Sequence, residues 1–192
     1  HADEYHQLAR MVYQEVKRIN RSIENFLKFA RPQPLSTELF QLDDFFEGLV
    51  KHYSRMLKEN NIDLLLELQW TGTVKWDREK IKQVFSNLIQ NAVDAFTGPG
   101  VIEISVLKIP EDSIEITLKD NGPGIPEEIL KKIFNLYFTT KDKGTGIGLS
   151  IVQQIVDLHN GVISLDSAPG RGTQFLIRLP VQVDHPHRNS RN

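Results

Sequence analysis

Apolar residues near the start of the chain recur at alternating steps of four and three positions, which is the spacing of a coiled-coil seam. The pattern runs from Tyr5 to Arg31 and predicts one long helix over that range. The prolines of Arg31-Pro32-Gln33-Pro34 end this helix, because each lacks an amide hydrogen and biases the preceding residue away from helical angles. The seam consists of Val12, Val16, Ile19, Ile23, Phe26 and Ala30.

A second helix and a strand are expected after a short linker. The helix should begin at about Asp44, whose side chain would cap the free amides while Glu47 completes a capping box. It should end at Asn60-Asn61. The segment from Ile62 to Leu68 then has the length and composition of a strand.

The strongest helical pattern lies between Asp77 and Phe96, where a wide apolar stripe indicates a helix that packs on a core. Apolar and polar residues then alternate in Ile102 to Val106 and in Ile114 to Leu118, as they do in half-buried strands. The residues Pro110-Glu111-Asp112 join these strands in a predicted antiparallel hairpin.

The last part of the chain predicts two further helices, from Pro126 to Ile133 and from Gly146 to His159, with a polar loop between them. Val162 to Leu165 and Gln174 to Leu179 are expected to be strands. Helices and strands therefore mix without the regular alternation of a parallel array. The predicted fold class is α+β, a two-layer sandwich with helices on one face of a mixed sheet.

This order divides the chain into four expected parts. Residues 1–31 form the long helix, 32–40 a linker, 41–181 the folded domain and 182–192 a polar tail. Because the first residue is His1 and not Met, we expect the chain to be a piece of a longer polypeptide.

Composition narrows the function classes. The formal net charge of -2 and the pI of about 6.3 provide no basic field that would attract nucleic acid, so no nucleic acid partner is expected. The longest apolar runs fall far short of the roughly 20 residues that span a bilayer. With no Cys, the chain has no disulfide framework and no thiolate metal site, which fits a cytoplasmic location.

Two glycine clusters have the chemistry of a nucleotide site. In the first, Asp120-Asn121-Gly122-Pro123-Gly124-Ile125-Pro126, the glycines let the backbone approach a flat ligand and the carboxylate can accept a hydrogen bond from the amino group of a base. The second, Gly144 to Leu149, precedes a helix, so that free amides and the helix dipole converge as a phosphate cradle. The first cluster alone is equally compatible with a plain strand-to-helix turn capped by Asp120, and the second alone is weak evidence, as any lone glycine-rich loop is.

Asn87 and Asn91 lie four residues apart on the predicted helix and share one of its faces, with Asp94 close to the same line. Amide oxygens are hard ligands that suit Mg²⁺, which keeps several waters and is shared with substrate phosphates. The alternative is that both asparagines merely form the wet side of an amphipathic helix.

Taken in order, five blocks between Asp77 and Pro180 resemble the ATP-binding domain of sensor histidine kinases, which has the Bergerat fold of the gyrase, MutL and Hsp90 ATPases. Five ordered blocks are far more specific than any single one. They are the N box Asn87 to Ala92, the first glycine box Asp120 to Gly124, the F box Ile133 to Lys141, the second glycine box Gly144 to Leu149, and the final element Gly170 to Thr173.

The resemblance implies that the domain binds ATP with Mg²⁺. Asn91 would hold the metal, Asp120 would accept the adenine amino group, and Thr173 would support Asp120 through water. Asn87 and Lys141 are the candidate catalytic residues and also belong to the ATP site, Lys141 as a lid residue that neutralises phosphate charge. The other implied ATP-binding residues are Gly122, Gly124, Ile125, Phe138, Thr139, Thr140, Gly144, Thr145, Gly146, Ile147, Gly148 and Leu149.

Two positions depart from the pattern of similar domains. Asp94 stands where many of them carry a basic residue that faces the phosphates, and we assign no phosphate contact to it. Leu136 replaces a common proline of the F box, which leaves the lid geometry open.

The helix that ends at Phe29-Ala30-Arg31-Pro32 is similar to the second helix of the family's dimerisation hairpin. The first helix, with the phosphorylated histidine, has no match, because neither His1 nor His6 precedes the usual acidic residue and Asn/Thr-Pro pair. The implied partners are therefore ATP, a histidine-bearing dimerisation helix of the parent protein and the receiver domain of a response regulator. The parent protein is expected to be a homodimeric sensor protein with this part in the cytosol.

Two other functions remain open at this point. Clamp ATPases of the same fold carry a glutamate as general base four residues before the metal-binding asparagine, where this chain has Asn87. Phosphoryl transfer to a nucleophilic imidazole needs positioning and charge neutralisation more than a base, so we expect a histidine kinase with slow hydrolysis. The alternatives are a nucleotide-dependent clamp ATPase and a non-catalytic nucleotide-sensing module.

Overall fold

The structure, a computed structural model, describes residues 5–7, 9–13, 15–17, 20, 34–141 and 144–182. All described residues before residue 21 are helical, in agreement with the first part of the predicted N-terminal helix. Residues 21–31 of that helix and 183–192 of the predicted tail lie outside the described residues. Of the predicted seam, Val12 and Val16 fall within the described part, and both are exposed.

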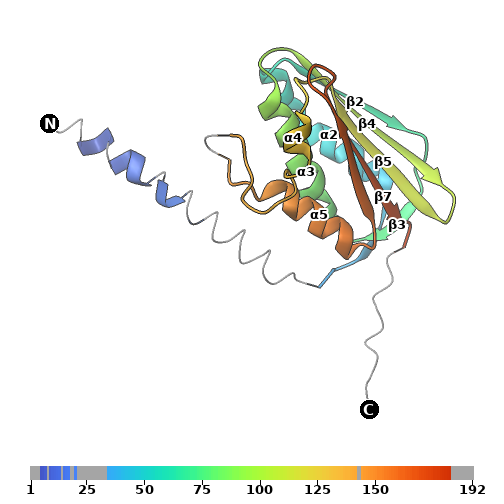
Figure 1. The fold of residues 1–192 in the computed structure, drawn as a ribbon. Coiled ribbons are helices and arrows are strands. Elements are labelled where there is room, and N and C mark those ends of the chain that lie inside the picture. Colours follow the sequence, from blue (N-terminus) through green and yellow to red (C-terminus); the bar gives the residue numbers. More distant parts are fainter. Residues whose placement is uncertain are drawn as a thin grey trace.

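A five-stranded mixed sheet forms one layer of the domain, with the strand order β2-β4-β5-β7-β6 (Figure 1). β2 (Ile62–Leu68) pairs in parallel with β4 (Gly100–Ile109), and the remaining pairs are antiparallel. These strands are β5 (Ser113–Asp120), β7 (Thr173–Pro180) and β6 (Val162–Ser167). All five strands, including the β4–β5 hairpin, were predicted from the sequence.

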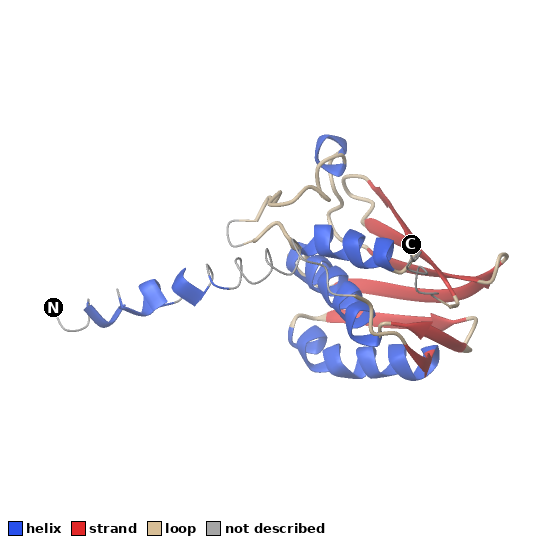
Figure 2. Ribbon diagram, turned by 90° about the horizontal axis from the view of Figure 1, so that it is seen from below, coloured by secondary structure: helices blue, strands red, loops and turns tan. Residues whose placement is uncertain are grey.

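Three helices cover one face of this sheet, so the fold is the predicted two-layer α+β sandwich (Figure 2). They are α2 (Leu42–Glu59), α3 (Arg78–Ala95) and α5 (Gly148–Leu158). A single helical turn, α4 (Glu127–Leu130), follows the loop after β5. No helix of the described residues is long and apolar enough to serve as a membrane span.

The core lies between the helices and the inner face of the sheet. The apolar stripe of α3 faces it, as predicted, with Val84, Leu88 and Ile89 fully buried. Phe46 of α2 packs edge-on against Phe85 of α3 with 5.0 Å between ring centroids. This packing fixes α3, and with it the polar face that carries the predicted asparagines.

A second, two-stranded sheet was not predicted. β1 (Glu38–Gln41) pairs antiparallel with β3 (Thr73–Trp76), and each strand has only four residues, too few for a period-two pattern to stand out. Because β1 begins at Glu38, the folded domain starts inside the range 32–40 that the sequence assigns to a linker.

The predicted capping box at the start of α2 is wrong. The helix begins at Leu42, two residues before Asp44, and its N-cap Gln41 makes no side-chain capping bond. Leu42 is fully buried, and its backbone N–H donates to the carbonyl of Gly72 at 3.2 Å. The strand β1 therefore runs directly into the helix, and a contact across the chain satisfies the amide that a local cap would serve.

Candidate functional site

A cavity of about 520 Å³ opens between α3, the loop after β5 and the start of α5. Segments far apart in the sequence meet there, and they are the segments that contain the five blocks. The predicted site residues that line the cavity are Asn87, Asn91, Asp120, Gly124, Ile125, Phe138, Thr139, Thr140, Lys141, Gly144, Thr145, Gly146, Gly148, Leu149 and Thr173.

Two predicted residues do not line the cavity. Gly122 lies beside it, and its backbone N–H donates to Asp120 Oδ1 at 2.9 Å. Ile147 is fully buried in the core, and its carbonyl accepts a hydrogen bond from the Ser150 hydroxyl at 2.8 Å. Both residues act on the cavity through the backbone, Gly122 by orienting a carboxylate and Ile147 by fixing the start of α5.

The cavity also has lining residues that the sequence reasoning did not assign to the site. Most are apolar and form a wall, and only Gln90 and Asp94 are polar. Gln90 and Ala92 belong to the N box, Pro123 to the first glycine box and Ile133 to the F box, so a signal for these four was present; the others lie in none of the five blocks. The additional lining residues are Gln90, Ala92, Asp94, Ala95, Pro123, Pro126, Ile129, Ile133 and Phe175.

Asp120 ends β5 and is only 5% exposed. Its Oδ1 accepts hydrogen bonds from the backbone N–H groups of Gly122 at 2.9 Å and Thr173 at 3.2 Å. Burial raises the pKa of Asp120, and these two amide hydrogen bonds oppose the rise. Because both donors reach Oδ1, Oδ2 is the carboxylate oxygen that can accept a hydrogen bond from a ligand in the cavity.

A hydroxyl network supports this carboxylate. Ser167 donates to the Gly172 carbonyl at 2.7 Å and accepts from the Ile125 N–H at 2.9 Å. A hydroxyl has one hydrogen, so in the 3.1 Å contact between Ser167 and Thr173 the donor is Thr173. The Thr173 oxygen then keeps a lone pair for a water or ligand. Ser167, which no sequence motif marks, ties the end of β6 to the loop after β5 and to the start of β7.

Gly124 is required by its surroundings. Its φ is +73°, and a Cβ on it would lie 1.9 Å from the carbonyl oxygen of Ala168. Close by, the Gly170 N–H donates to the carbonyl of Pro123 at 2.7 Å. The first glycine box is thus packed backbone to backbone against the turn after β6, which makes this end of the cavity rigid.

Asn87 and Asn91 face the cavity from α3, as their spacing predicts. Asn87 Nδ2 lies 3.4 Å from the carbonyl oxygen of Gly148 and donates to it, which links α3 to the start of α5. Asn91 makes no side-chain hydrogen bond within the described residues. No cluster of three acidic or histidine side chains suited to a metal occurs in the described part of the chain. The Asn91 amide oxygen therefore suits Mg²⁺ as one ligand of an ion that keeps waters and binds phosphates.

Within the described residues, no side chain caps the start of α5. The N-cap residue Ile147 makes no side-chain capping bond, and Gly148 and Leu149 both line the cavity. The first amides of a helix lack partners within the helix and carry the positive end of its dipole. This end of the cavity therefore suits an anion.

Lys141 lies across the cavity from α3 and pairs with Asp94, with 2.8 Å between Nζ and Oδ2. Its backbone N–H donates to the Thr139 hydroxyl at 3.1 Å, and its carbonyl accepts from the Gly144 N–H at 3.0 Å. The side chains of Lys141 and Asp94 are each 39% exposed. The predicted lid lysine is thus held by a carboxylate to which the sequence analysis gave no role.

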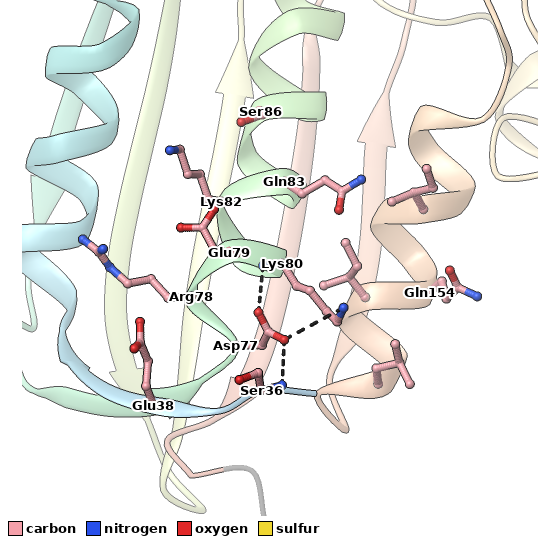
Figure 3. A pocket seen from close by; sticks show the side chains of 13 residues that line it. Ser36, Glu38, Asp77, Arg78, Glu79, Lys80, Lys82, Gln83, Ser86 and Gln154 are labelled. Atoms are coloured by element: carbon pink, nitrogen blue, oxygen red, sulfur yellow. Dashed lines mark hydrogen bonds and ion pairs between the residues drawn. The ribbon is translucent and has the colours of Figure 1, made fainter. Parts of the chain in front are cut away.

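A larger cavity, of about 750 Å³, lies between the first turns of α3 and the last turns of α5 (Figure 3). It surrounds the N-cap of α3, where Asp77 accepts from the N–H groups of Ser36 at 2.8 Å and Lys80 at 3.0 Å. None of the predicted site residues lines it. Despite its size, we therefore interpret it as a surface groove beside a structural network.

His159 belongs to that network and is fully buried. Its Nε2 accepts from the Asp77 backbone N–H at 3.0 Å, so Nδ1 carries the hydrogen and donates to the carbonyl of Ile155 at 2.8 Å. Burial lowers the pKa of His159, and the Ile155 carbonyl opposes this shift. The neutral ring joins the start of α3 to the end of α5.

Comparison with known families identifies the domain that contains this cavity. Residues 76–183 match the family described as histidine kinase-, DNA gyrase B-, and HSP90-like ATPase. The matched range contains every predicted site residue.

Curated relatives cover nearly the whole chain. The sensor histidine kinase ZraS of Klebsiella oxytoca is 34% identical over 93% of this chain and 39% of its own length. Sporulation kinase C of Bacillus subtilis (strain 168) is 33% identical over 91% of this chain and 41% of its own length. The chain therefore spans about two fifths of the length of these relatives.

Solved structures show the same fold. The catalytic domain of histidine kinase ThkA matches with a TM-score of 0.70 and 33% identity, over 77% of this chain and 97% of that domain. A structure of ThkA in complex with the response regulator protein TrrA matches with a TM-score of 0.75 and 29% identity, over 89% of this chain and 49% of the other.

Proposed function

This chain belongs to the family of histidine kinase-, DNA gyrase B- and HSP90-like ATPases, and we propose that it is the catalytic part of a sensor histidine kinase that binds ATP with Mg²⁺. The observation that carries the proposal is the meeting of a buried carboxylate, an amide-bearing helix face and an open helix start around one cavity. The carboxylate suits the base, the helix start suits the phosphates, and the side-chain amide suits the magnesium ion bound to those phosphates.

The base end of the cavity, where adenine would bind, is formed by Asp120 and the residues that hydrogen-bond to it. Oδ2 of Asp120 accepts a hydrogen bond from the adenine amino group, and Thr173 assists through a water. The buried position favours a base, because a flat apolar ring can fill a site walled by Ile125 and Ile133. A guanine base would present a carbonyl oxygen to Asp120 and be repelled.

The phosphate end is formed by the start of α5, Lys141 and Asn91. The free amides of α5 receive the phosphate oxygens, as helix starts commonly do. Lys141 supplies positive charge. Mg²⁺ would be held by Asn91, and when bound it neutralises phosphate charge and helps to orient the transferred group.

Transfer to histidine is favoured over hydrolysis by water. Of the described residues that line the cavity, only Asp94 and Asp120 are carboxylates. Asp94 is engaged by Lys141 and Gln90, and Asp120 lies at the base end. Asn87, where the clamp ATPases carry their general base, cannot take a proton from water.

In the proposed reaction a neutral imidazole nitrogen attacks the γ-phosphorus. The new N–P bond forms as the bond from phosphorus to the β,γ-bridging oxygen breaks, and ADP leaves. Asn87 and Lys141 position and neutralise the transferred group. The acceptor histidine would stand on a dimerisation helix of the homodimeric parent protein, in the cytoplasm, and would pass the phosphoryl group to a response regulator receiver domain.

The test supplies γ-labelled ATP and Mg²⁺ to the chain together with a separate hairpin that carries an acceptor histidine. We expect label on the hairpin, no label on a matched hairpin with His→Gln, and slow release of free phosphate. Rapid phosphate release without transfer would instead support a clamp ATPase. Unchanged ATP affinity in Asn91→Ala would support a non-catalytic module.

A further inference from the structure

The ion pair between Asp94 and Lys141 closes one side of the cavity between α3 and the loop after Phe138. The two residues are 47 positions apart in the chain, and both line the cavity. The contact is short, with 2.8 Å between Nζ and Oδ2. The cation that the phosphate end needs is therefore already bound to an anion of the protein.

Both partners are held in place from behind. Gln90, one turn before Asp94 on α3, donates to Asp94 Oδ1 at 2.6 Å, which leaves Oδ2 for the lysine. The backbone of Lys141 is held by the Thr139 hydroxyl and by the Gly144 N–H. Two independent supports direct the side chains at each other, so the pair is a defined feature of the cavity.

We propose that Asp94 is a specificity-determining residue that competes with the phosphate chain of the nucleotide for Lys141. A ligand gains the Lys141 contact only when its phosphate charge displaces the Asp94 carboxylate. The inference rests on the proposed function, because it takes a nucleotide as the ligand. Its consequence is that the cavity binds the phosphate chain less tightly than the lysine alone would allow, while the binding of the base is unaffected.

The size of the effect follows from exposure. Both side chains are 39% exposed, so the pair is screened by solvent and is worth about 0.2 to 1 kcal/mol. Removing the competitor should therefore tighten ATP binding by about 1.5- to 5-fold, which is the same range of free energy expressed as a ratio of dissociation constants.

The experiment measures the affinity of the chain for Mg-ATP and for adenosine at about 0.15 M salt, where exposed charges beyond about 8 Å are screened. Asp94→Asn should tighten Mg-ATP binding within that range and leave adenosine binding unchanged. Glu79→Gln is the matched control, since it removes the same charge from the first turn of α3 and should change neither affinity. Thermal unfolding of each variant checks that the fold is kept.

A second background separates competition from direct repulsion. In Lys141→Gln the gain from Asp94→Asn should disappear, because there is no lysine left to release. An equal or larger gain in that background would mean that Asp94 acts on the phosphates directly, and would overturn the proposal. Weaker Mg-ATP binding by Asp94→Asn would also overturn it, since Asp94 would then position the lysine or bind the metal. If the unsubstituted chain bound neither Mg-ATP nor adenosine, that result would instead contradict the proposed function.

Discussion

The two ends of the cavity are built in different ways. At the base end, Asp120 is buried, its Oδ1 receives two backbone amides, and Gly124 is packed against a neighbouring turn. At the phosphate end, Lys141 and Asp94 are partly exposed and form an ion pair with each other. The base end is therefore part of the core, whereas the phosphate end is a set of groups that a ligand can rearrange.

The difference indicates where affinity and adjustment lie. Burial strengthens an electrostatic contact, and it makes a buried polar group without a hydrogen-bond partner costly. The base end should therefore dominate discrimination between ligands. Exposed charges contribute little each and respond to salt and to substitution. Changes at the base end should thus have larger effects than changes at the phosphate end.

The largest effect is expected from Asp120→Asn, which replaces a charged acceptor by a neutral amide. ATP affinity should fall by about 10- to 100-fold, as is typical for loss of a hydrogen bond to a charged group. Titration calorimetry with ATP measures it.

The same variant should not be less stable. The folded-state pKa of Asp120 is raised above the 3.8 of an ordinary carboxyl, so its favourable contribution is present below that value and is lost as pH rises through the folded pKa. Above the folded pKa the ionised group is therefore a burden that the amide removes. A large drop in unfolding temperature for Asp120→Asn would show that the carboxylate holds the fold and not the base.

The next effect concerns the rigidity of the base end. Gly124→Ala should destabilise the domain by about 2 kcal/mol or more, because the added Cβ would collide with the Ala168 carbonyl at 1.9 Å and the φ is strained. Gly170→Ala is the control: its φ of +75° is similarly strained, but its Cβ would meet nothing within 4 Å. Denaturant unfolding should show a smaller loss of unfolding free energy for Gly170→Ala than for Gly124→Ala. Equal losses would show that close packing around Gly124 adds nothing to the cost of its strained φ.

At the phosphate end, Lys141→Ala should weaken ATP binding by only about 3- to 10-fold, because the contact is solvent-exposed and replaces an existing ion pair. Adenosine affinity should stay the same. Parallel titrations with the two ligands measure the difference, and an equal loss for both would mean that Lys141 supports the cavity as a whole.

The last effect concerns stability, in the frame behind both ends where His159 joins α3 to α5. Its pKa is lowered in the folded state, so the unfolded chain takes up a proton near the ordinary value of 6.5 while the folded chain does not. Its contribution to stability is complete above 6.5 and declines as pH falls toward the lowered folded pKa. Denaturant unfolding should show a lower free energy of unfolding at pH 5.5 than at pH 7.5, and His159→Asn should lack this decline.

Much of this site was predictable because its chemistry lies in contiguous motifs. Asn87 and Asn91 are one helical turn apart, and the glycine boxes stand next to elements with clear hydrophobic patterns. A local pattern places such residues on a helix face or at a helix start, and five blocks in order identify the fold.

The features that local sequence patterns do not predict depend on contacts between distant segments. Ser167 binds Ile125 across 42 residues, and Asp94 binds Lys141 across 47, with no motif to mark either pair. The strand β1 and the start of α2 were mispredicted for the same reason, since pairing with β3 and the Gly72 carbonyl decide them. Local propensity had little weight against these tertiary contacts.

In the proposed site, Asp120 selects adenine, and the attached phosphates are held with magnesium. Titration calorimetry of the chain with Mg-ATP and with Mg-GTP distinguishes this selection from unselective binding. We expect saturable binding of ATP and affinity for GTP lower by at least about 10-fold, because guanine places an acceptor opposite the carboxylate. Equal affinity for the two nucleotides, or no binding of ATP by folded protein, would contradict it.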